Sequence, residues 1–251
     1  MKSLKQQIYD LLGAFAFLTV LPIPERLVKD SNFSSSMAYF PLVGYAQGGL
    51  LCAFYFYLSD YISDPLLTVL AVVLLYMTNF GFHADGFMDT VDALAGGRTK
   101  ERRLEIMKDS NVGAIGALFM MLVLLLILMG LFSFKNSFII PVLFFLPLAG
   151  HWSMVALSFI SNPAKSEGLA SSFGTVSFMV FFTATVFIIL PIIYFSYFYI
   201  LWGLLSVIVF CLLVSFLAHK KFGGVTGDVY GFMNQLAQCV FVVTMSFKGV
   251  L

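Results

Sequence analysis

The chain reads D-G-F-M-D-T-V-D-A-L-A-G-G-R-T-K-E-R-R-L-E-I-M-K-D from Asp85 to Asp109, with acidic and basic residues close together. A long uncharged, apolar run begins at Val112, directly after this stretch, and ends at Phe134. Charged side chains are costly near a bilayer, so a dense mixed cluster beside membrane-length apolar runs indicates a functional site. Carboxylates suit a divalent metal, and arginines suit phosphate.

The composition assigns the rest of the chain to the membrane. Of 251 residues, 60% are hydrophobic and 11% charged, which is far from the average of soluble proteins. About 20 apolar residues cross the hydrocarbon core as a helix. The uncharged runs that reach this length are Ser31–Ser59, Val112–Phe134, Asn136–Ala164 and Val176–Ala218. Apolar runs continue to the end of the chain, which is not the pattern of a single secretory signal peptide.

We therefore predict an all-α, polytopic membrane protein with about seven or eight transmembrane or re-entrant helices. It forms one domain, residues 1–251, in which 83–111 is the charged catalytic segment. The predicted spans are Phe40–Leu58, Leu66–Phe82, Val112–Phe134, Phe138–Ile160, Val176–Phe195, Tyr199–Ala218 and Val229–Phe247. The segment Ile8–Leu21 is short and contains Asp10, so it is either an eighth span or a re-entrant or interfacial helix.

Isolated polar residues within the spans have ordinary explanations. The last span carries three amides, Asn234, Gln235 and Gln238, and we expect it to face other helices rather than lipid. The three cysteines lie singly in apolar runs without metal-ligand spacing, which favours buried thiols. His151 lies inside a span and is a candidate for a buried hydrogen bond. His83 is either a ligand or a structural residue.

The basic residues predict the orientation of the protein. Threading seven spans places four segments on one face: Pro22–Tyr39, His83–Asn111, Ser161–Thr175 and His219–Asp228. These segments hold Arg26, Lys29, Arg98, Lys100, Arg102, Arg103, Lys108, Lys165, Lys220 and Lys221, whereas the opposite loops hold Lys135 and Lys248. By the positive-inside rule the richer face is cytoplasmic. Lys2 and Lys5 then favour a first segment that does not cross.

Three aspartates of the charged segment share one helix face. Each residue of an α-helix advances by about 100°, so Asp85, Asp89 and Asp92 fall within an arc of about 60°. Carboxylates this close repel one another unless a cation lies between them. Hard oxygen ligands favour Mg²⁺ or Mn²⁺.

A second helix is expected after the aspartates. Gly96-Gly97 should end the first helix, and Thr99 is a plausible N-cap for the next. Such a hairpin would bring Asp109 back towards the aspartate face. The alternative for residues 100–108 is an ordinary solvated surface, in which Arg102 pairs with Glu105.

Two further polar segments lie on the same predicted face. One is the turn Asn162–Gly168, which contains Lys165 and one glutamate. The other, Gly223–Asp228, combines glycines, which allow backbone N–H groups to approach an anion, with a carboxylate. Either segment alone is a weak indication of a binding site.

These residues together resemble the signature of the cobalamin synthase family, CobS. The resemblance rests mainly on residues 82–98 and 103–110, and this central motif is long and specific. Weaker matches are Phe17-Leu18-Thr19 with Leu21-Pro22-Ile23-Pro24, Phe40–Gly44, Pro163–Leu169 and Gly224–Asp228. The chain departs from the family pattern where arginine is usual at His151 and Lys165, and where glutamate is usual at Gln235 and Gln238.

The resemblance implies an adenosylcobinamide-GDP ribazoletransferase of the prokaryotic plasma (inner) membrane, with cytoplasmic catalytic loops. Its small-molecule substrates would be adenosylcobinamide-GDP and α-ribazole or its 5′-phosphate, and GMP would leave. The cofactor would be Mg²⁺, held by Asp85, Asp89, Asp92 and Asp109, with Asp92 a candidate proton acceptor. The expected substrate-binding residues are Arg98, Arg102, Arg103, Lys108, Glu105, Lys165 and Asp228.

The expected partners are these substrates and the lipid bilayer, with no nucleic acid, and a homo-oligomer is open. Two other classes remain. A CDP-alcohol phosphotransferase also clusters aspartates at this face, but its D-G-x-x-A-R spacing fails after Asp85-Gly86. A transporter would place ion sites near the midplane, often with internal repeats, and no repeat is evident.

Overall fold

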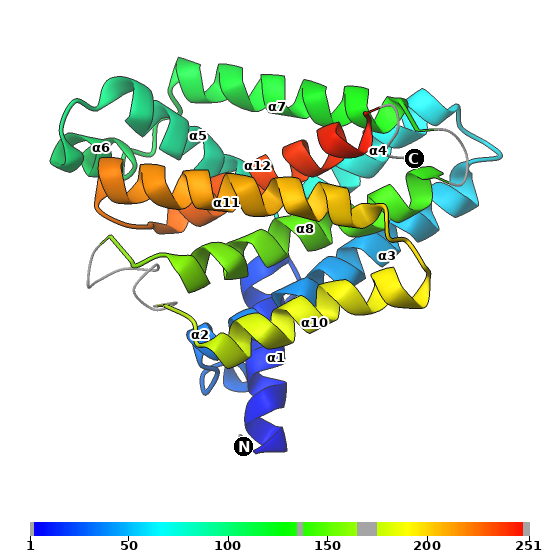
Figure 1. The fold of residues 1–251 in the computed structure, drawn as a ribbon, viewed down its shortest axis with the longest axis horizontal. Coiled ribbons are helices and arrows are strands. Elements are labelled where there is room, and N and C mark those ends of the chain that lie inside the picture. The colour runs from blue at the N-terminus through cyan, green and yellow to red at the C-terminus, as the bar shows by residue number, and fades with distance from the viewer. Residues whose placement is uncertain (1–2, 135–137, 165–174, 248–251) are drawn as a thin grey trace.

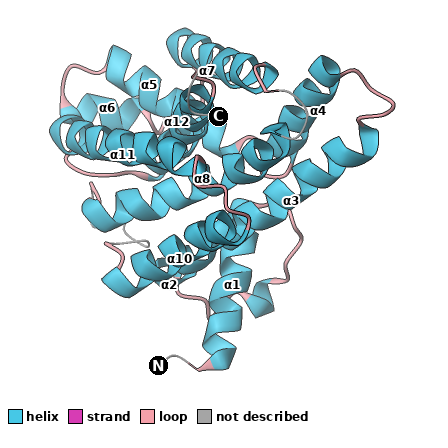
Figure 2. Cartoon of the chain, turned by 45° about the vertical axis from the view of Figure 1, so that its right-hand side comes forward, coloured by secondary structure: helices cyan, strands magenta, loops and turns pink. Residues whose placement is uncertain are grey.

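The computed structural model describes residues 3–134, 138–164 and 175–247 as a bundle of helices (Figure 1). In chain order the elements are α1 (Leu4–Leu18), the 3₁₀ helix η1 (Glu25–Leu27), α2 (Phe33–Ser36), the 3₁₀ helix η2 (Met37–Tyr39), α3 (Phe40–Leu58), α4 (Asp64–Met77), α5 (Phe82–Gly96), α6 (Lys100–Ile106), α7 (Ala114–Phe132), α8 (Ile139–Ile160), α10 (Phe178–Tyr194), α11 (Ile200–Phe222) and α12 (Gly227–Met245). The described residues contain no strand, only one isolated bridge (Figure 2). The all-α class predicted from composition is confirmed.

Helix α8 is the centre of the bundle. In its apolar stretch 89% of the residues are buried, against 33% for α7 and for α11. Figure 1 shows α8 enclosed by α3, α10, α11 and α12. A helix that is apolar on all sides is stable when neighbours cover it, which is the situation of α8. Helices α7 and α11 instead leave one side open, as expected of helices that face lipid.

The spans agree with the prediction in kind but not in every boundary. In the described chain, four helical stretches are long and apolar enough to cross a membrane: Phe33–Leu58, Ala114–Phe132, Ile139–Ile160 and Ile200–Phe222. Helices α4 and α5 meet the test only as a pair, and they are bent by 85° at a short break. By this measure the count is four or five, so the predicted seven or eight remains a prediction.

The break between α4 and α5 corrects the predicted span Leu66–Phe82. Helix α4 ends at Met77, and the chain passes through left-handed backbone at Phe80 (φ 49°) and Gly81 (φ 70°). The side chain of Asn79 accepts a hydrogen bond from the Gly81 N–H at 2.9 Å and closes this turn. A left-handed phenylalanine is unusual, and the apolar run hides it from sequence analysis.

Helix α1 is too short to cross and is tied to the segment that follows it. Its buried Asp10 accepts hydrogen bonds from the Asn32 N–H (2.9 Å) and the Ser35 hydroxyl (2.7 Å) at the start of α2. A carboxylate at a helix N-terminus satisfies N–H groups that have no partner within the helix. In Figure 1, α1 runs across the direction of α3, α8 and α10, which favours the non-crossing alternative.

Candidate active site

Three aspartates lie along one face of α5, as their spacing predicts. Asp85 is exposed in the first turn, where the helix dipole favours a carboxylate, and Asp89 and Asp92 are half-buried. The negative charges of Asp85, Asp228 and Asp92 all act on the Asp89 carboxyl. Like charges this close disfavour ionisation unless a cation or donor offsets them. This face of α5 is therefore a place where positive charge is stabilised.

Asp92 has a second role that the sequence does not reveal. Its two oxygens accept hydrogen bonds from the Gly113 N–H (2.9 Å) and the Gly116 N–H (2.8 Å) at the start of α7. A Cβ at Gly113 or Gly116 would lie 2.3 or 2.4 Å from an Asp92 oxygen, so a side chain at either position would displace the carboxylate. Asp92 thus caps α7 and joins it to α5. Its role as proton acceptor stays a prediction.

Asp109 lies in the exposed turn after α6. Its Oδ1 accepts hydrogen bonds from the Asn111 N–H (3.0 Å) and the Asn111 side-chain amide (2.7 Å). These bonds, with a smaller contribution from Arg102, lower the pKa of Asp109 below its usual value. The expected return of Asp109 towards the aspartates of α5 does not appear among the contacts of the described residues. Its role as a metal ligand stays a prediction.

Asp228 takes part in the carboxylate cluster instead. It lies in the first turn of α12, whose N-cap Thr226 accepts a hydrogen bond from the Val229 N–H at 3.3 Å. Burial raises the pKa of Asp228 to about 6, and the charge of Asp85 contributes. The sequence indicated Asp228 as a substrate-binding residue. The structure adds that it shares its surroundings with Asp85 and Asp89.

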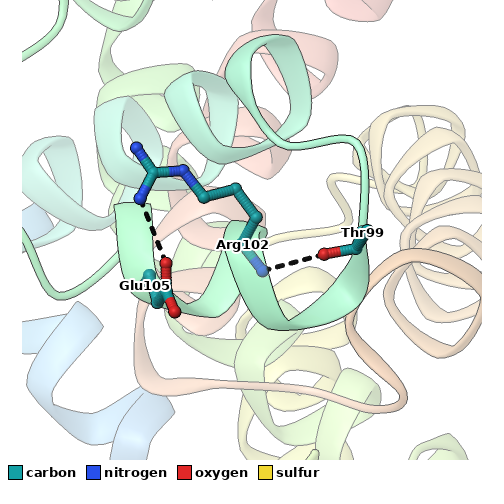
Figure 3. A network of polar contacts seen from close by, with 3 residues as sticks. All are labelled: Thr99, Arg102 and Glu105. Carbon is teal, nitrogen blue, oxygen red and sulfur yellow. Dashed lines mark hydrogen bonds and ion pairs between the residues drawn. The ribbon is translucent and has the colours of Figure 1, made fainter.

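The predicted hairpin after the aspartates is present. Helix α5 ends at Gly96, and Thr99 caps α6 by accepting a hydrogen bond from the Arg102 N–H at 3.2 Å (Figure 3). Figure 3 also shows the Arg102 guanidinium paired with Glu105 at 3.0 Å, both side chains being 64% exposed. An exposed pair of this kind contributes little to stability. Arg102 and Glu105 thus fit the solvated alternative.

The remaining cations of the hairpin differ in their surroundings. Arg98 and Lys108 are exposed. Arg103 instead folds over Gly97, where an added Cβ would lie 2.2 Å from the Arg103 Cγ, and its Nη1 reaches 3.4 Å from the Lys221 carbonyl oxygen of α11. Arg103 therefore fixes α6 against the end of α11, whereas Arg98 and Lys108 are free to meet an anion.

Two polar segments that are far apart in sequence lie side by side. The Val225 N–H donates to the Asn162 carbonyl, and the Ala164 N–H donates to the Val225 carbonyl, both at 2.9 Å. Gly224 (φ 146°) allows this approach, since a Cβ there would lie 2.6 Å from the Asn162 oxygen. The predicted gathering of polar loops on one face is confirmed for these segments. Lys165 lies outside the described residues.

A cavity of about 600 Å³ with a mixed polar and apolar lining adjoins the aspartate helix. Asp85 lines it together with Thr19 and Asn79, so it joins the amino-terminal motif to the break between α4 and α5. The other lining residues are Phe17, Leu18, Val20, Phe80, Gly81, Phe82, Ala84 and Met88. The neighbouring cavities of about 450 and 480 Å³ are lined by apolar side chains. The cavity at Asp85 is therefore a candidate for the reacting part of a substrate.

The donors fit Mg²⁺ in kind but do not form a closed cage. In the described residues no three His, Cys, Asp or Glu side chains are grouped as a metal site, and this includes the four predicted ligands. Mg²⁺ in phosphoryl-transfer enzymes is usually held by one or two carboxylates, water and the substrate phosphates. Asp85, Asp89 and Asp228 offer such an incomplete set, so the residues are compatible with a metal completed by substrate.

Three of the departures from the family pattern, His151, Gln235 and Gln238, lie inside the bundle. His151 Nε2 lies 2.7 Å from the Gln47 Oε1, and the Asn234 Nδ2 lies 3.2 Å from His151 Nδ1. Gln238 donates to the Asn234 Oδ1 at 2.7 Å, and Gln235 accepts from a tyrosine of α4. The expected hydrogen-bonding role of His151 and the burial of the α12 amides are confirmed. We call Gln47, His151, Asn234 and Gln238 the neutral network.

His83 is also in this interior rather than at the site. It is fully buried, and its ring meets the His151 ring edge-on at 5.4 Å. Among the described residues neither of its ring nitrogens has a hydrogen-bond partner. The structural alternative for His83 therefore fits better than that of an exposed ligand.

Sequence reasoning missed Thr19 and Asn79 as cavity residues. Thr19 stood in a weak motif without an assigned role, and Asn79 was placed inside a span. The spacing of Asn79 and Gly81 was the available signal, since Asn followed two residues later by Gly is typical of a turn.

The chain is similar to proteins of one known family over most of its length. The model of the family described as Cobalamin-5-phosphate synthase, CobS, matches residues 10–246. The adenosylcobinamide-GDP ribazoletransferase of Thermoanaerobacter sp. (strain X514) is 31% identical over 251 residues, covering 95% of this chain and 97% of the relative. Proteins of the same name from Desulfitobacterium hafniense (strain Y51) and Clostridium novyi (strain NT) are each 34% identical, covering 92% and 96% of this chain and 93% and 98% of the relatives. No solved structure matches the chain.

Proposed function

Because the chain belongs to the cobalamin-5-phosphate synthase (CobS) family, we propose that it joins adenosylcobinamide-GDP to α-ribazole or its 5′-phosphate and releases GMP. A part in cobalamin synthesis follows from the family. The substrates, the release of GMP and the use of Mg²⁺ are the proposal.

The observation that carries the proposal is the meeting of carboxylates from α5 and α12 beside a cavity. Asp85 lines the cavity, and the charges of Asp85 and Asp228 act on Asp89. Segments from three parts of the chain thus supply acid groups, exposed cations and space for a substrate. Transfer between phosphate esters needs this combination, since it depends on alignment and on neutralising charge.

The reaction balances as a substitution at phosphorus. A ribazole hydroxyl oxygen forms a bond to the phosphorus attached to the corrinoid, and the bond from that phosphorus to the bridging oxygen breaks. GMP leaves with the bridging oxygen and its electron pair. A carboxylate of the cluster accepts the hydroxyl proton.

The acidic and basic residues of the site would have different roles in this reaction. Asp85, Asp89 and Asp228 would hold Mg²⁺, which when bound neutralises negative charge on phosphate oxygens. Arg98 and Lys108 are exposed in the hairpin that follows α5 and would hold the diphosphate and the leaving GMP. Arg102 and Glu105 would join them by exchanging their mutual pair for contacts with substrate. Asp92 holds α5 to α7 and so keeps the aspartate face in place.

We place the protein in a prokaryotic plasma membrane with this face in the cytoplasm. The distribution of basic residues supports this orientation. Several apolar helices of spanning length support the membrane itself.

An assay of the purified protein in lipid tests the function. Adenosylcobinamide-GDP, α-ribazole 5′-phosphate and Mg²⁺ are supplied, and GMP and the corrinoid product are followed by chromatography. We expect the two products in equal amounts, and neither when the acceptor or Mg²⁺ is left out. GMP release without acceptor would indicate a hydrolase, and no release at all would contradict the proposal.

A further inference from the structure

Helices α5 and α12 touch through two glycines. A Cβ built at Gly86 would lie 2.9 Å from the Asp228 carbonyl oxygen, 3.0 Å from the Asp228 Cα and 3.3 Å from the Gly231 Cα. A Cβ at Gly231 would lie 3.1 Å from the His83 carbonyl oxygen and 3.2 Å from the Gly86 Cα. All these neighbours are backbone atoms, which cannot rotate away as the end of a side chain can. A side chain at either position would therefore require the two backbones to move apart.

This contact determines where the Asp228 carboxylate lies. Gly86 directly follows Asp85 on α5, and its missing side chain is the space that the Asp228 backbone occupies. Asp228 is consequently held next to Asp85, and its charge acts on Asp89. Two segments more than a hundred residues apart thereby contribute to one cluster of carboxylates.

Close packing through glycine is common in membrane bundles, so the contact alone would show only tight packing. This chain provides the comparison. Gly48 packs against the Phe144 backbone (2.3 Å from its carbonyl oxygen), and Gly203 packs against the Phe241 ring (2.5 Å). Neither contact involves a charged residue. Asp92 meets Gly113 and Gly116 through its own side chain, whereas at Gly86 the backbone of a carboxylate-bearing residue, Asp228, lies against the glycine.

We propose that the contact of Gly86 with Gly231 is a positioning device that makes Asp228 a member of the metal-holding carboxylate cluster of α5. The inference rests on the proposed function and assigns to Asp228 the place in the cluster that we expected for Asp109. Gly231 is a positioning residue, since it acts through Asp228 and not by touching substrate.

Binding of Mn²⁺ without substrate tests this directly. Purified protein in lipid nanodiscs is titrated with Mn²⁺, and free Mn²⁺ is measured by electron paramagnetic resonance. Gly231→Ala should separate α12 from α5 and raise the Kd for Mn²⁺ by roughly 10- to 100-fold, the usual cost of disturbing the support of a ligand. Asp228→Asn should raise it at least as much.

The decisive arm combines the two changes. If Gly231 acts through Asp228, then Gly231→Ala added to Asp228→Asn should produce no further loss of Mn²⁺ binding. Gly203→Ala, which adds a methyl group against α12 away from the cluster, should leave the Kd within twofold or so of the unaltered protein. Gly49→Ala, where nothing lies within 4 Å, controls for the substitution itself.

The outcomes distinguish the positioning role of Gly231 from the metal assignment of the proposed function. Unchanged Mn²⁺ binding in Gly231→Ala would overturn the positioning role. So would a double variant that binds Mn²⁺ more weakly than Asp228→Asn by the same factor that Gly231→Ala produces alone. Unchanged binding in Asp89→Asn would instead remove the metal assignment of the proposed function itself. If Gly231→Ala is not recovered folded, Asp228→Glu moves the carboxylate by one methylene without adding an atom at the glycine contact. It should weaken Mn²⁺ binding similarly, and unchanged binding would count against the proposal.

Discussion

The four residues of the neutral network pair with one another inside the bundle, whereas the carboxylates where α5 meets α12 face like charge. In the neutral network, His151 lies between Gln47 and Asn234, and every contact joins neutral groups at 2.7 to 3.2 Å. In the carboxylate cluster, Asp89 is surrounded by the charges of three other aspartates. Helix α12 contributes to both regions, with Asp228 in the carboxylate cluster and Asn234 and Gln238 in the neutral network.

The two regions differ in whether their polar groups have partners within the protein, and this difference indicates which region stabilises the fold and which performs chemistry. Buried polar groups in a membrane protein need partners inside the protein, and the neutral network provides them. A cluster of like charges weakens the fold, and such a cluster is kept where a ligand offsets it. We therefore assign stability to the neutral network and chemistry to the carboxylate cluster.

The face of the protein that carries the carboxylate cluster and the opposite face should differ completely in access from solution. In a variant whose native cysteines are replaced, Thr99→Cys on the charged face should react with an impermeant thiol reagent only after the cytoplasm is opened. Ser59→Cys, in the opposite loop, should react in intact cells. This follows from the excess of basic residues on the Thr99 face. Reaction of Thr99→Cys in intact cells would contradict both the orientation and the placement of the active site.

Arg98→Lys should weaken the chemistry while leaving the fold unchanged. An arginine binds two phosphate oxygens at once, whereas lysine acts as a point charge. A charge-assisted contact contributes about 1.5–3 kcal/mol. Since 1.4 kcal/mol corresponds to a factor of ten, kcat/KM for adenosylcobinamide-GDP should fall by about 10- to 150-fold.

Steady-state kinetics with each substrate varied in turn measure this effect. The KM for α-ribazole phosphate should change much less, and Arg26→Lys, at an exposed arginine outside the site, is the matched control. If Arg98→Lys affects only ribazole phosphate, Arg98 belongs to the acceptor and the two substrates are placed the other way round.

Asn234→Ala should weaken the fold while leaving the chemistry nearly unchanged. It removes the partner of His151 and of Gln238 in a buried place, and an unpaired buried polar group costs about 1–3 kcal/mol. We expect the free energy of unfolding to fall by this amount in a detergent titration, with kcat/KM per folded molecule within about threefold of the original. A large loss of activity without loss of stability would place the neutral network in the active site.

The sequence predicted much of the site because its signals are local. The face shared by Asp85, Asp89 and Asp92 follows from helix periodicity, and the cap of α6 follows from Thr99 after Gly97. Hydrogen bonding between α12 and its neighbours followed from amides in an apolar helix. These features depend on residues within a few turns of one another.

What the sequence did not predict depends on contacts between distant segments. The capping of α7 by Asp92 and the approach of Asp228 through Gly86 exist only once the helices pack. The break at Phe80 was hidden because an apolar residue stands where left-handed backbone usually selects glycine or asparagine. The departures at His151 and Gln238 lie in the buried neutral network, and only the packing of α8 against α12 brings them together.

The central claim is that the carboxylates of α5 perform Mg²⁺-dependent chemistry, and Asp89→Asn tests it most directly because it removes charge and keeps shape. The measurement is GMP release from adenosylcobinamide-GDP across a series of Mg²⁺ concentrations, with Asp60→Asn in the opposite loop as the control. The account predicts a loss of more than about 100-fold for Asp89→Asn, beyond the cost of disturbing a mere supporting group, and full activity for Asp60→Asn. Near-original rates for Asp89→Asn at limiting Mg²⁺ would contradict it.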